Sequence, residues 1–249
     1  MTLGSTGIAV AALVVLTGAI VFSLRLEHPW LQPWAIVRAA VQLGILSLIL
    51  VGVIQSPVWV ALFLTAMVLA ASWTVYTRLK LERRALPFLV LTVVVSAGVP
   101  VVIVFALGAV DLSPRYALAL GGIIVGNVMT VTTLMGRLLG SQLLSGRDEV
   151  EGWLALGATP RQAAQGVVRS ASSSAIIPST DQTRTTGIVT LPGAFVGAVF
   201  GGASPLGAAE FQMVVLASIL AAGAIAITAM TWRYGAPTQL PTEPAPLGR

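Results

Sequence analysis

The side chains of this sequence that could handle a ligand are few and mostly neutral. Three amides, Gln42, Asn127 and Gln212, lie inside long apolar runs. Amides in such surroundings either bond neighbouring helices, which is worth about 0.6–2 kcal/mol each, or line a polar path, and the sequence leaves both roles open. Met129 and Met213 lie near these amides, and a thioether is a soft metal ligand. Methionine more often fills space in a core, so the sequence alone defines no metal site.

Motifs for catalysis and nucleotide binding are missing from the sequence. The chain has no cysteine, which excludes disulfides, thiolate ligands and cysteine nucleophiles. It also has no GxxxxGK[ST] phosphate loop and no HExxH or GxSxG motif. We therefore expect that the chain is not an enzyme and holds no cofactor of its own.

The elements that must position these amides are membrane spans. Of the 249 residues, 56% are hydrophobic and only 9% are charged, whereas soluble domains have about 25% charged residues. The apolar runs have the roughly 20 residues that an α-helix needs to cross about 30 Å of hydrocarbon. The sequence predicts an all-α polytopic membrane protein with about seven transmembrane helices, at 4–24, 33–54, 57–77, 86–109, 116–136, 187–204 and 209–231.

The basic residues predict an orientation. With the N-terminus outside and the C-terminus inside, 13 of the 14 Lys and Arg residues fall on the inner side, and only Arg115 is left outside. Because these residues flank apolar runs, the net charge of +5 does not indicate a nucleic-acid partner. No Asp, Glu, Lys or His falls near the middle of a predicted span, which counts against a proton-coupled carrier.

A polar island at 148–178 separates predicted spans five and six. Acidic residues open a first short helix, which should end at Gly157, the residue type that favours the left-handed conformation. Thr159, Pro160 and Gln162 then form a capping box with proline at the first helical position, so a second short helix starts there. We expect two cytosolic coupling helices, although an ordinary interfacial connection has the same local signals.

The residues after this island predict further features. The serines of 163–178 favour a helix lying at the membrane interface over a re-entrant one. Pro192 and Gly193 should break or kink the sixth span. Glycines repeat every four residues from Gly193 to Gly201, which lets another helix approach closely. The proline-rich tail at 235–249 is predicted to be disordered, so the transmembrane domain covers 1–234, with a cytosolic coupling region at 137–186.

Five stretches resemble a known family. They are VRAAVQL from Val37, IIVGNVM from Ile123, LALGATPRQA from Leu154, IIPSTDQTRTTGIVTLPG from Ile176 and FGGASPLGAAEFQ from Phe200. These strings, spaced over most of the chain, resemble the FetB (YbbM-type) permease family, the membrane half of an iron-export ABC transporter. Glu151 and Gly157 stand six apart, similar to the Glu and Gly of the EAA loop with which importers contact their ATPase.

The resemblance implies a multi-pass permease of the bacterial inner membrane that forms a homodimer and binds two copies of a separate ABC ATPase, which carries the ATP and magnesium. It places the ATPase contact on Glu151, Trp153, Leu156, Gly157, Ala158, Thr159, Pro160 and Gln162. Asp181 corresponds to an acid that would attract a cation at the cytosolic mouth. Its alternative role is that of a helix N-terminal acid, because Ser179 and Gln182 form a capping box around it.

The candidate substrate path combines the polar, flexible and kinked positions, namely Gln42, Asn127, Met129, Asp181, Pro192, Gly193 and Gln212. Two departures from the family remove atoms that could bind metal. Ala194 and Phe195 stand where the family carries two methionines, and Ser204 stands where it often has Asp. The metal ligands are therefore unknown, and plant relatives linked to aluminium tolerance and sugar-nucleotide transport widen the range of substrates.

We expect the permease subunit of an ATP-driven exporter of iron or another metal species. One alternative is a secondary carrier or channel that works without an ATPase. Another is a non-transporting membrane regulator, although such proteins usually have a large outer domain and the outer loops predicted here are short.

Overall fold

The computed structural model describes residues 3–25 and 28–237. Apart from one isolated bridge between Thr186 and Thr190, the regular structure of these residues is helical, which confirms the predicted all-α class. The chain divides into two compact units, Met1–Ser56 and Pro57–Arg249. Each unit is described by itself.

The first unit is a pair of apolar helices, α1 (Leu3–Ser23) and α2 (Leu31–Val53), which pack against each other. The rings of Phe22 and Trp30 meet edge to face near the turn, with 5.0 Å between their centroids. Both helices are long and apolar enough to cross a membrane.

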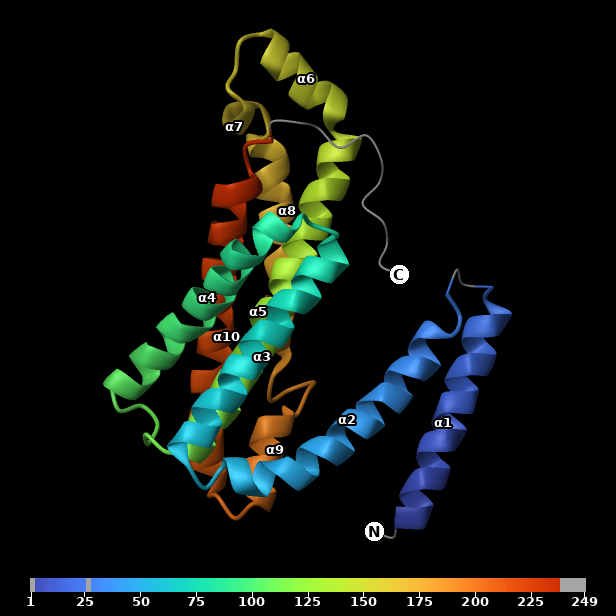
Figure 1. The fold of residues 1–249 in the computed structure, drawn as a ribbon, viewed down its shortest axis with the longest axis vertical. Coiled ribbons are helices and arrows are strands. Elements are labelled where there is room, and N and C mark those ends of the chain that lie inside the picture. Colours follow the sequence, from blue (N-terminus) through green and yellow to red (C-terminus); the bar gives the residue numbers. More distant parts are fainter. Residues whose placement is uncertain (1–2, 26–27, 238–249) are drawn as a thin grey trace. The chain divides into compact units, whose positions relative to one another are not determined.

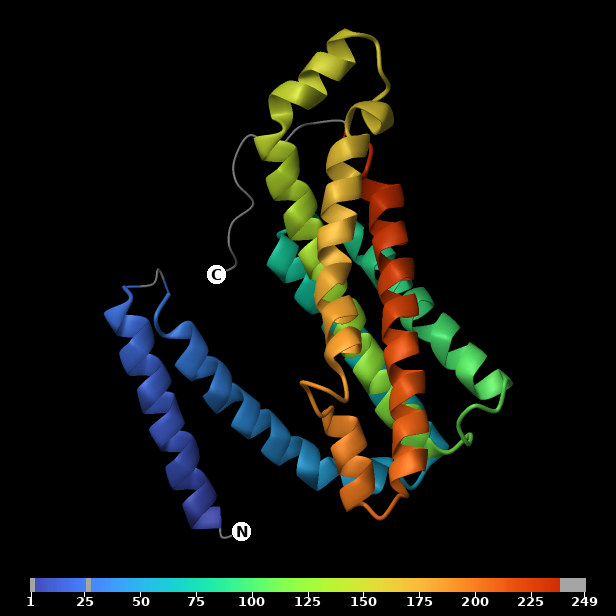
Figure 2. The same ribbon diagram turned by 180° about the vertical axis from the view of Figure 1, so that it is seen from behind.

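The second unit contains the remaining helices. They are α3 (Pro57–Leu79), the 3₁₀ turn η1 (Arg83–Ala85), α4 (Leu86–Ala106), α5 (Pro114–Ser145), α6 (Arg147–Ala155), α7 (Pro160–Ala163), α8 (Gln165–Thr185), α9 (Gly193–Phe200) and α10 (Pro205–Tyr234). Within this unit α5 and α10 lie side by side, and α3, α4 and α8 pack around them (Figures 1 and 2). Figure 1 shows α6 and α7 together at one end of the unit and α9 at the other.

The two central helices, α5 and α10, begin in the same way. The Ser113 hydroxyl accepts a hydrogen bond from the Tyr116 N–H at 3.3 Å, and the Ser204 hydroxyl accepts one from the Gly207 N–H at 3.1 Å. A proline follows each serine at the first helical position, where its missing N–H costs nothing. Ser204 therefore caps the start of α10.

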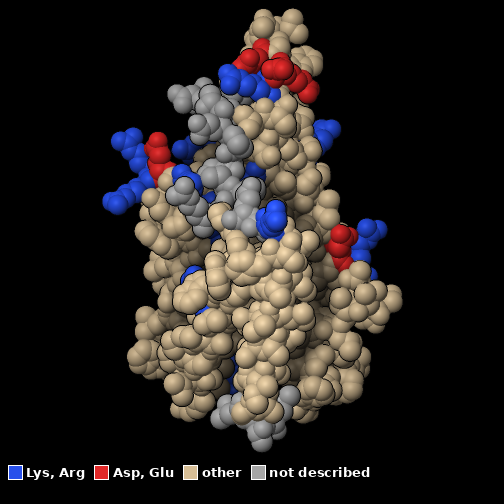
Figure 3. Space-filling view, turned by 90° about the vertical axis from the view of Figure 1, so that its right-hand side faces the viewer, with Lys and Arg blue, Asp and Glu red and all other residues tan. Residues whose placement is uncertain are grey.

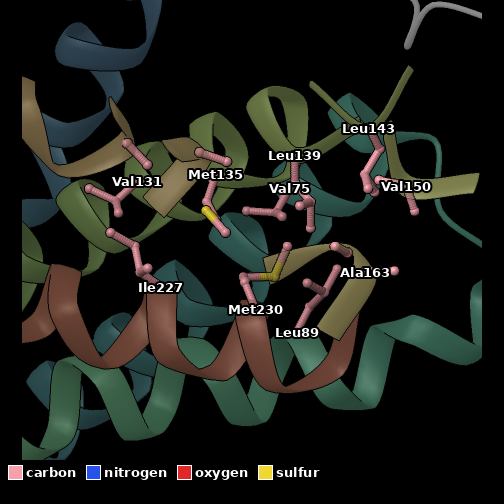
Figure 4. Packing of buried hydrophobic residues seen from close by; sticks show 13 residues of the cluster. Val75, Leu89, Val131, Met135, Leu139, Leu143, Val150, Ala163, Ile227 and Met230 are labelled. Carbon is pink, nitrogen blue, oxygen red and sulfur yellow. The ribbon is translucent and has the colours of Figure 1, made fainter. Parts of the chain in front are cut away.

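Apolar side chains from most helices of the second unit meet in its core. Val75 of α3, Leu89 of α4, Met135 of α5 and Met230 of α10 are essentially inaccessible to solvent and belong to one cluster (Figure 4). A second cluster continues along the same helices, with Ile124 at 0% exposure. Between helices that span a membrane, close packing of apolar side chains rather than removal from water provides the attraction, so these clusters fix the helices as one bundle.

The predicted spans match the structure at six positions. In the described part of the chain, six helices are long and apolar enough to cross a membrane, at Gly4–Ser23, Leu31–Val53, Pro57–Leu79, Arg83–Ala106, Pro114–Ser145 and Pro205–Tyr234. The fifth is longer than predicted because Leu139 and Leu143 continue its buried face beyond residue 136. Orientation and a count of seven spans stay predictions.

Two predictions about residues 163–204 were wrong. The predicted span at 187–204 is not one helix, since a tight turn precedes the eight-residue α9. The segment 163–178 is not an interfacial helix either, because it belongs to α8, a 21-residue helix that packs along α5 and α10. Its buried Ala171 and Ala175 form the packing face. Because α8 contains many hydroxyl and charged side chains, its mean hydropathy is too low for it to be predicted as a span. The predicted disordered tail lies, from residue 238 on, outside the described residues.

Candidate transport site and coupling surface

The turn between α6 and α7 has the local geometry that the sequence predicts. Gly157 adopts a φ of +90°, the left-handed conformation that ends α6. The Thr159 N–H donates to Gln162 Oε1 at 3.0 Å, and the Gln162 N–H donates to Thr159 Oγ1 at 3.4 Å. Pro160 is the first residue of α7, so the capping box is confirmed in full. The second short helix is only partly as expected, because α7 ends at Ala163 and α8 starts two residues later.

We call residues 147–164 the handle. Its inner side is fixed to the bundle, since Val150, Ala163 and Ala164 are 5% exposed or less and join the core cluster of Figure 4. On its outer side Arg147 Nε donates to Glu151 Oε1 at 2.6 Å. An exposed ion pair of this kind adds only about 0.3–0.5 kcal/mol. The apolar contacts therefore hold the handle in place.

The outer side of the handle carries apolar groups that nothing in the second unit covers. The Trp153 side chain is 52% exposed and Leu156 is 82% exposed. Acidic and basic atoms gather at one end in Figure 3, and the first turn of α6 carries Asp148 and Glu149. Exposed apolar groups among charged ones are typical of a protein-docking surface.

The handle also connects to the last helix. Arg161 Nη2 donates to the carbonyl oxygen of Trp232 at 3.1 Å. Trp232 lies in the final turn of α10, where backbone carbonyls lack helical partners and favour a cation. Sequence analysis missed this role of Arg161, because nothing in the spacing relates residues 71 apart.

A polar contact joins α5 and α8 inside the bundle. Asn127 Nδ2 donates to Ser179 Oγ at 3.2 Å, and Ser179 is only 4% exposed. Asn127 Oδ1 is buried and has no partner among the described residues. Asn127 lies about 20 Å along α5 from Pro114, at the helical rise of about 1.5 Å per residue. The contact is therefore deep in the apolar part of the bundle.

Asp181 does not lie where the sequence suggests. Ser179 and Gln182 are inside α8, so they form no capping box, and Asp181 is not a helix N-terminal acid. Nor does it lie beside the handle, because about 24 Å of helix separates it from Gln165. It follows Ser179 by two residues, at the depth of Asn127, on an exposed face. Asp181 therefore places a carboxyl group about 3 Å along α8 from Ser179. It lies outside the spans predicted from the sequence, so the absence of acids near the middle of those spans stays a prediction.

The chain breaks before α9 at the predicted place, and hydrogen bonds within the turn pair part of its backbone. The Thr185 carbonyl accepts from the N–H groups of Val189 and Thr190 at 2.9 and 3.2 Å, and the Gly187 N–H donates to the Thr190 carbonyl. Pro192 then precedes α9, which starts at Gly193. Hydrogen bonds within the turn thus pair several of the backbone groups that the break frees.

The other candidate residues differ in burial and lie on several helices. Met129 is partly buried against both core clusters, whereas Met213 is 70% exposed. Gln212 is 5% exposed near the start of α10, with an unpartnered Oε1. Gln42 is exposed on α2 of the first unit. Among the described residues, no three His, Cys, Asp or Glu side chains group as metal ligands.

The glycine face of α9 is open. A Cβ built at Gly193 or Gly197 would meet no atom within 4 Å, so no part of the second unit lies against these two glycines. Phe200 at the end of α9 is 86% exposed, and Ile188 in the preceding turn is 89% exposed. Within the second unit, these two glycines therefore have no close helix neighbour.

Sequence analysis assigned Ser179 to a capping box, whereas its hydroxyl binds Asn127. It did not identify Ser172 as a contact residue. The Ser172 hydroxyl lies 3.4 Å from Thr231 Oγ1 and 3.9 Å from Met135 Sδ, so α8 contacts α10 and α5 through it. The available signal was the period of small residues at 171, 175 and 179, which indicates a helix face packed closely on others.

A bundle of span-length helices that holds a polar contact at its centre defines an integral, multi-pass membrane protein. Comparison of sequences gives the family: the chain belongs to the uncharacterised protein family UPF0014, which it matches over residues 6–236. It is 33% identical to the rice UPF0014 membrane protein STAR2, over 90% of this chain and 80% of that one. It is 32% identical to Protein ALUMINUM SENSITIVE 3 of Arabidopsis thaliana, over 90% and 83% of the two chains.

A bacterial relative carries a name that concerns transport. The chain is 29% identical to the "Probable iron export permease protein FetB" of Escherichia coli K12, over 86% of this chain and 84% of that one. The predicted resemblance to this family is thereby confirmed. No solved structure matches the chain.

Proposed function

We propose that the chain is the permease subunit of an ATP-driven exporter of the bacterial inner membrane, powered by a separate ABC ATPase. One observation carries this proposal: the exposed apolar handle is fixed to the same helices that hold the deep polar contact. Val150 anchors it to the bundle core, Arg161 binds α10, and α8 leads from the handle to Ser179. A push on Leu156 is thus transmitted along α8 and α10.

The cargo we propose is a cation, namely iron or another metal species. Asp181 supplies a negative charge on the exposed face of α8, and on the packed face Asn127 Oδ1 is a buried acceptor without a partner among the described residues. Oxygen atoms of this kind bind hard cations. The printed name of the Escherichia coli relative supports iron export, whereas the name of the Arabidopsis relative refers to aluminium.

The working form we propose is a homodimer. A carboxylate that faced lipid at the depth of Asp181 would be costly, so the exposed face of α8 needs water or protein beside it. The open glycine face of α9 adjoins it in sequence and accepts a close helix neighbour. A second copy supplies that neighbour and encloses a polar path between the two α8 helices.

A second candidate function is a proton-coupled carrier, and Asp181 is the observation that favours it, because intramembrane carboxyl groups relay protons. The deciding experiment uses liposomes that contain the purified chain with or without an ABC ATPase from the same organism. Iron transport that needs the ATPase and hydrolysable ATP supports our proposal. Transport driven by a pH gradient without the ATPase would refute it and support the carrier.

A further inference from the structure

Two opposite charges lie on the exposed face of α8, a helix that packs on α5 and α10 (Figure 2). They belong to Asp181 and Arg184, and both side chains are exposed. In the part of the chain that the structure describes, neither of them forms an ion pair. Because α5 and α10 are long and apolar enough to cross a membrane, two unpaired charges beside them would be costly against lipid.

The exposed face of α8 is narrow and mostly polar. At about 100° per residue, six exposed residues of this helix fall within about 40° on either side of Ile177. These six are Gly166, Ser170, Ser173, Ile177, Asp181 and Arg184. Ile177 is the only large apolar residue among them, so this face suits a protein or water neighbour better than lipid.

Asp181 and Arg184 lie on opposite sides of the middle of this face. Seen along the helix axis, Asp181 is turned about 40° one way from Ile177 and Arg184 about 20° the other way. Along the axis the two residues are about 4.5 Å apart. The long stem of an arginine side chain spans such a rise.

A twofold axis would bring these charges together reciprocally. All copies of one chain insert into a membrane with the same orientation, so the axis of a homodimer is perpendicular to the membrane. Two α8 helices that face each other across this axis run in the same direction. The side of one helix that carries Asp181 then meets the side of the other that carries Arg184, and the converse also holds. The face is therefore complementary in charge to a second copy of itself.

We propose that two copies of the chain pair through α8, with Asp181 of each copy bound to Arg184 of the other. This inference rests on the proposed homodimer and assigns a regulatory contact to its path. The two ion pairs close the path between the α8 helices while no cation is bound. A cation that binds Asp181 displaces Arg184, because both compete for the same carboxylate oxygens, so the cargo itself opens the path.

The pairing can be tested with two charge-reversed variants that carry different affinity tags. Asp181→Arg gives the face two bases, and Arg184→Asp gives it two acids. Like charges repel in each same-variant dimer, whereas a mixed dimer restores both ion pairs. After co-expression, native mass spectrometry should show mixed dimers in an excess of about fivefold or more over either same-variant dimer. Random mixing of two chains gives an excess of only about twofold.

An exposed acid and base near the start of α5 provide the matched control. The variants Asp111→Arg and Arg115→Asp should mix at random. Random mixing of the Asp181 and Arg184 variants as well would overturn the pairing. An ion pair within one α8 would give that result, because mixing cannot restore it. If wild-type chains with two tags form no dimer at all, the homodimer of the proposed function is refuted too.

Cysteine variants keep the pairing testable if a reversed charge prevents folding. The chain has no cysteine, so Asp181→Cys on one tagged chain and Arg184→Cys on another provide one thiol each. A short bis-maleimide should join these two chains several-fold more than Gln182→Cys with Arg184→Cys. Gln182 is also exposed but is turned about 140° from Ile177, away from the second copy. Equal cross-linking of the two combinations would overturn the pairing.

Displacement by the cargo is tested separately by iron binding to the purified chain. Arg184→Gln removes the competing cation, so isothermal titration calorimetry should show Fe²⁺ bound about tenfold more tightly than by the wild type. Arg169→Gln, at an exposed arginine of α8 outside the proposed pair, should leave the affinity unchanged. An unchanged affinity in Arg184→Gln would overturn the displacement. If none of the three proteins binds Fe²⁺, the proposed cargo is refuted and the displacement with it.

Discussion

Arg161 of the handle donates a hydrogen bond to the carbonyl oxygen of Trp232, 3.1 Å away, in the final turn of α10. The bond joins the exposed coupling surface to a central helix of the bundle by a direct contact. Its donor carries a full charge and its acceptor belongs to the negative end of a helix, an arrangement that stabilises both partners. The predicted consequences of this and the other contacts can be tested one by one.

Replacing Arg161 should uncouple ATP hydrolysis from transport. Arg161→Met keeps the length of the side chain but removes the bond to α10, so the handle moves without α10. We expect ATPase binding to be unchanged and the iron transported per ATP to fall several-fold in liposomes. Arg169→Met, at an exposed arginine of α8, is the matched control. Equal coupling in the two variants would contradict the role of Arg161.

Replacing Leu156 should weaken ATPase docking. Leu156 is 82% exposed in the free chain, and an aspartate at this position would have to bury an unpaired charge in the proposed complex, so Leu156→Asp should lower the affinity about tenfold or more. Surface plasmon resonance with the immobilised permease measures this change. Leu112→Asp, at an 80% exposed leucine between α4 and α5, should leave the affinity unchanged. The docking surface is elsewhere if the two variants behave alike.

Removing the capping box should loosen the handle without unfolding the bundle. Thr159→Ala deletes the hydroxyl that accepts from the Gln162 N–H, at a cost of about 1 kcal/mol. Hydrogen exchange of the α7 amides should therefore accelerate about fivefold. Thr228→Ala, whose hydroxyl bonds within α10, is the control and should leave α7 unchanged. Unaltered exchange in Thr159→Ala would mean that tertiary contacts alone hold the turn.

Neutralising Asp181 should impair transport but not assembly. Asp181→Asn keeps the shape of the side chain and removes the charge that attracts the cation, so iron transport should fall at least tenfold while ATPase binding persists. Asp111→Asn, at an exposed acid between α4 and α5, should transport normally. Full transport by Asp181→Asn would remove this residue from the path.

Filling the glycine face of α9 should prevent dimer formation. Gly197→Leu meets no atom within 4 Å in the single chain, so the fold should tolerate it while a close helix neighbour cannot. Light scattering of the detergent-solubilised protein should show a monomer. Gly166→Leu should remain a dimer. If Gly197→Leu also remains a dimer, the two copies meet through another face.

The sequence by itself determined the all-α membrane class, six of the span-length helices and the turn that ends at Thr159, Pro160 and Gln162. These features depend on interactions among near neighbours. Hydropathy over about 20 residues decides whether a helix can span, and a capping box closes within four residues. Gly157 was identified for the same reason, because its left-handed conformation is a property of the residue itself.

Only the tertiary structure decided where α8 lies and, with it, the depth of Asp181. A helix with many hydroxyl and charged groups is too polar to be recognised as a span, yet Ala171 and Ala175 let it pack tightly between α5 and α10. The contacts of Ser179 with Asn127 and of Arg161 with Trp232 join residues 52 and 71 positions apart. No local period relates such distant positions, because the packing of whole helices brings them together.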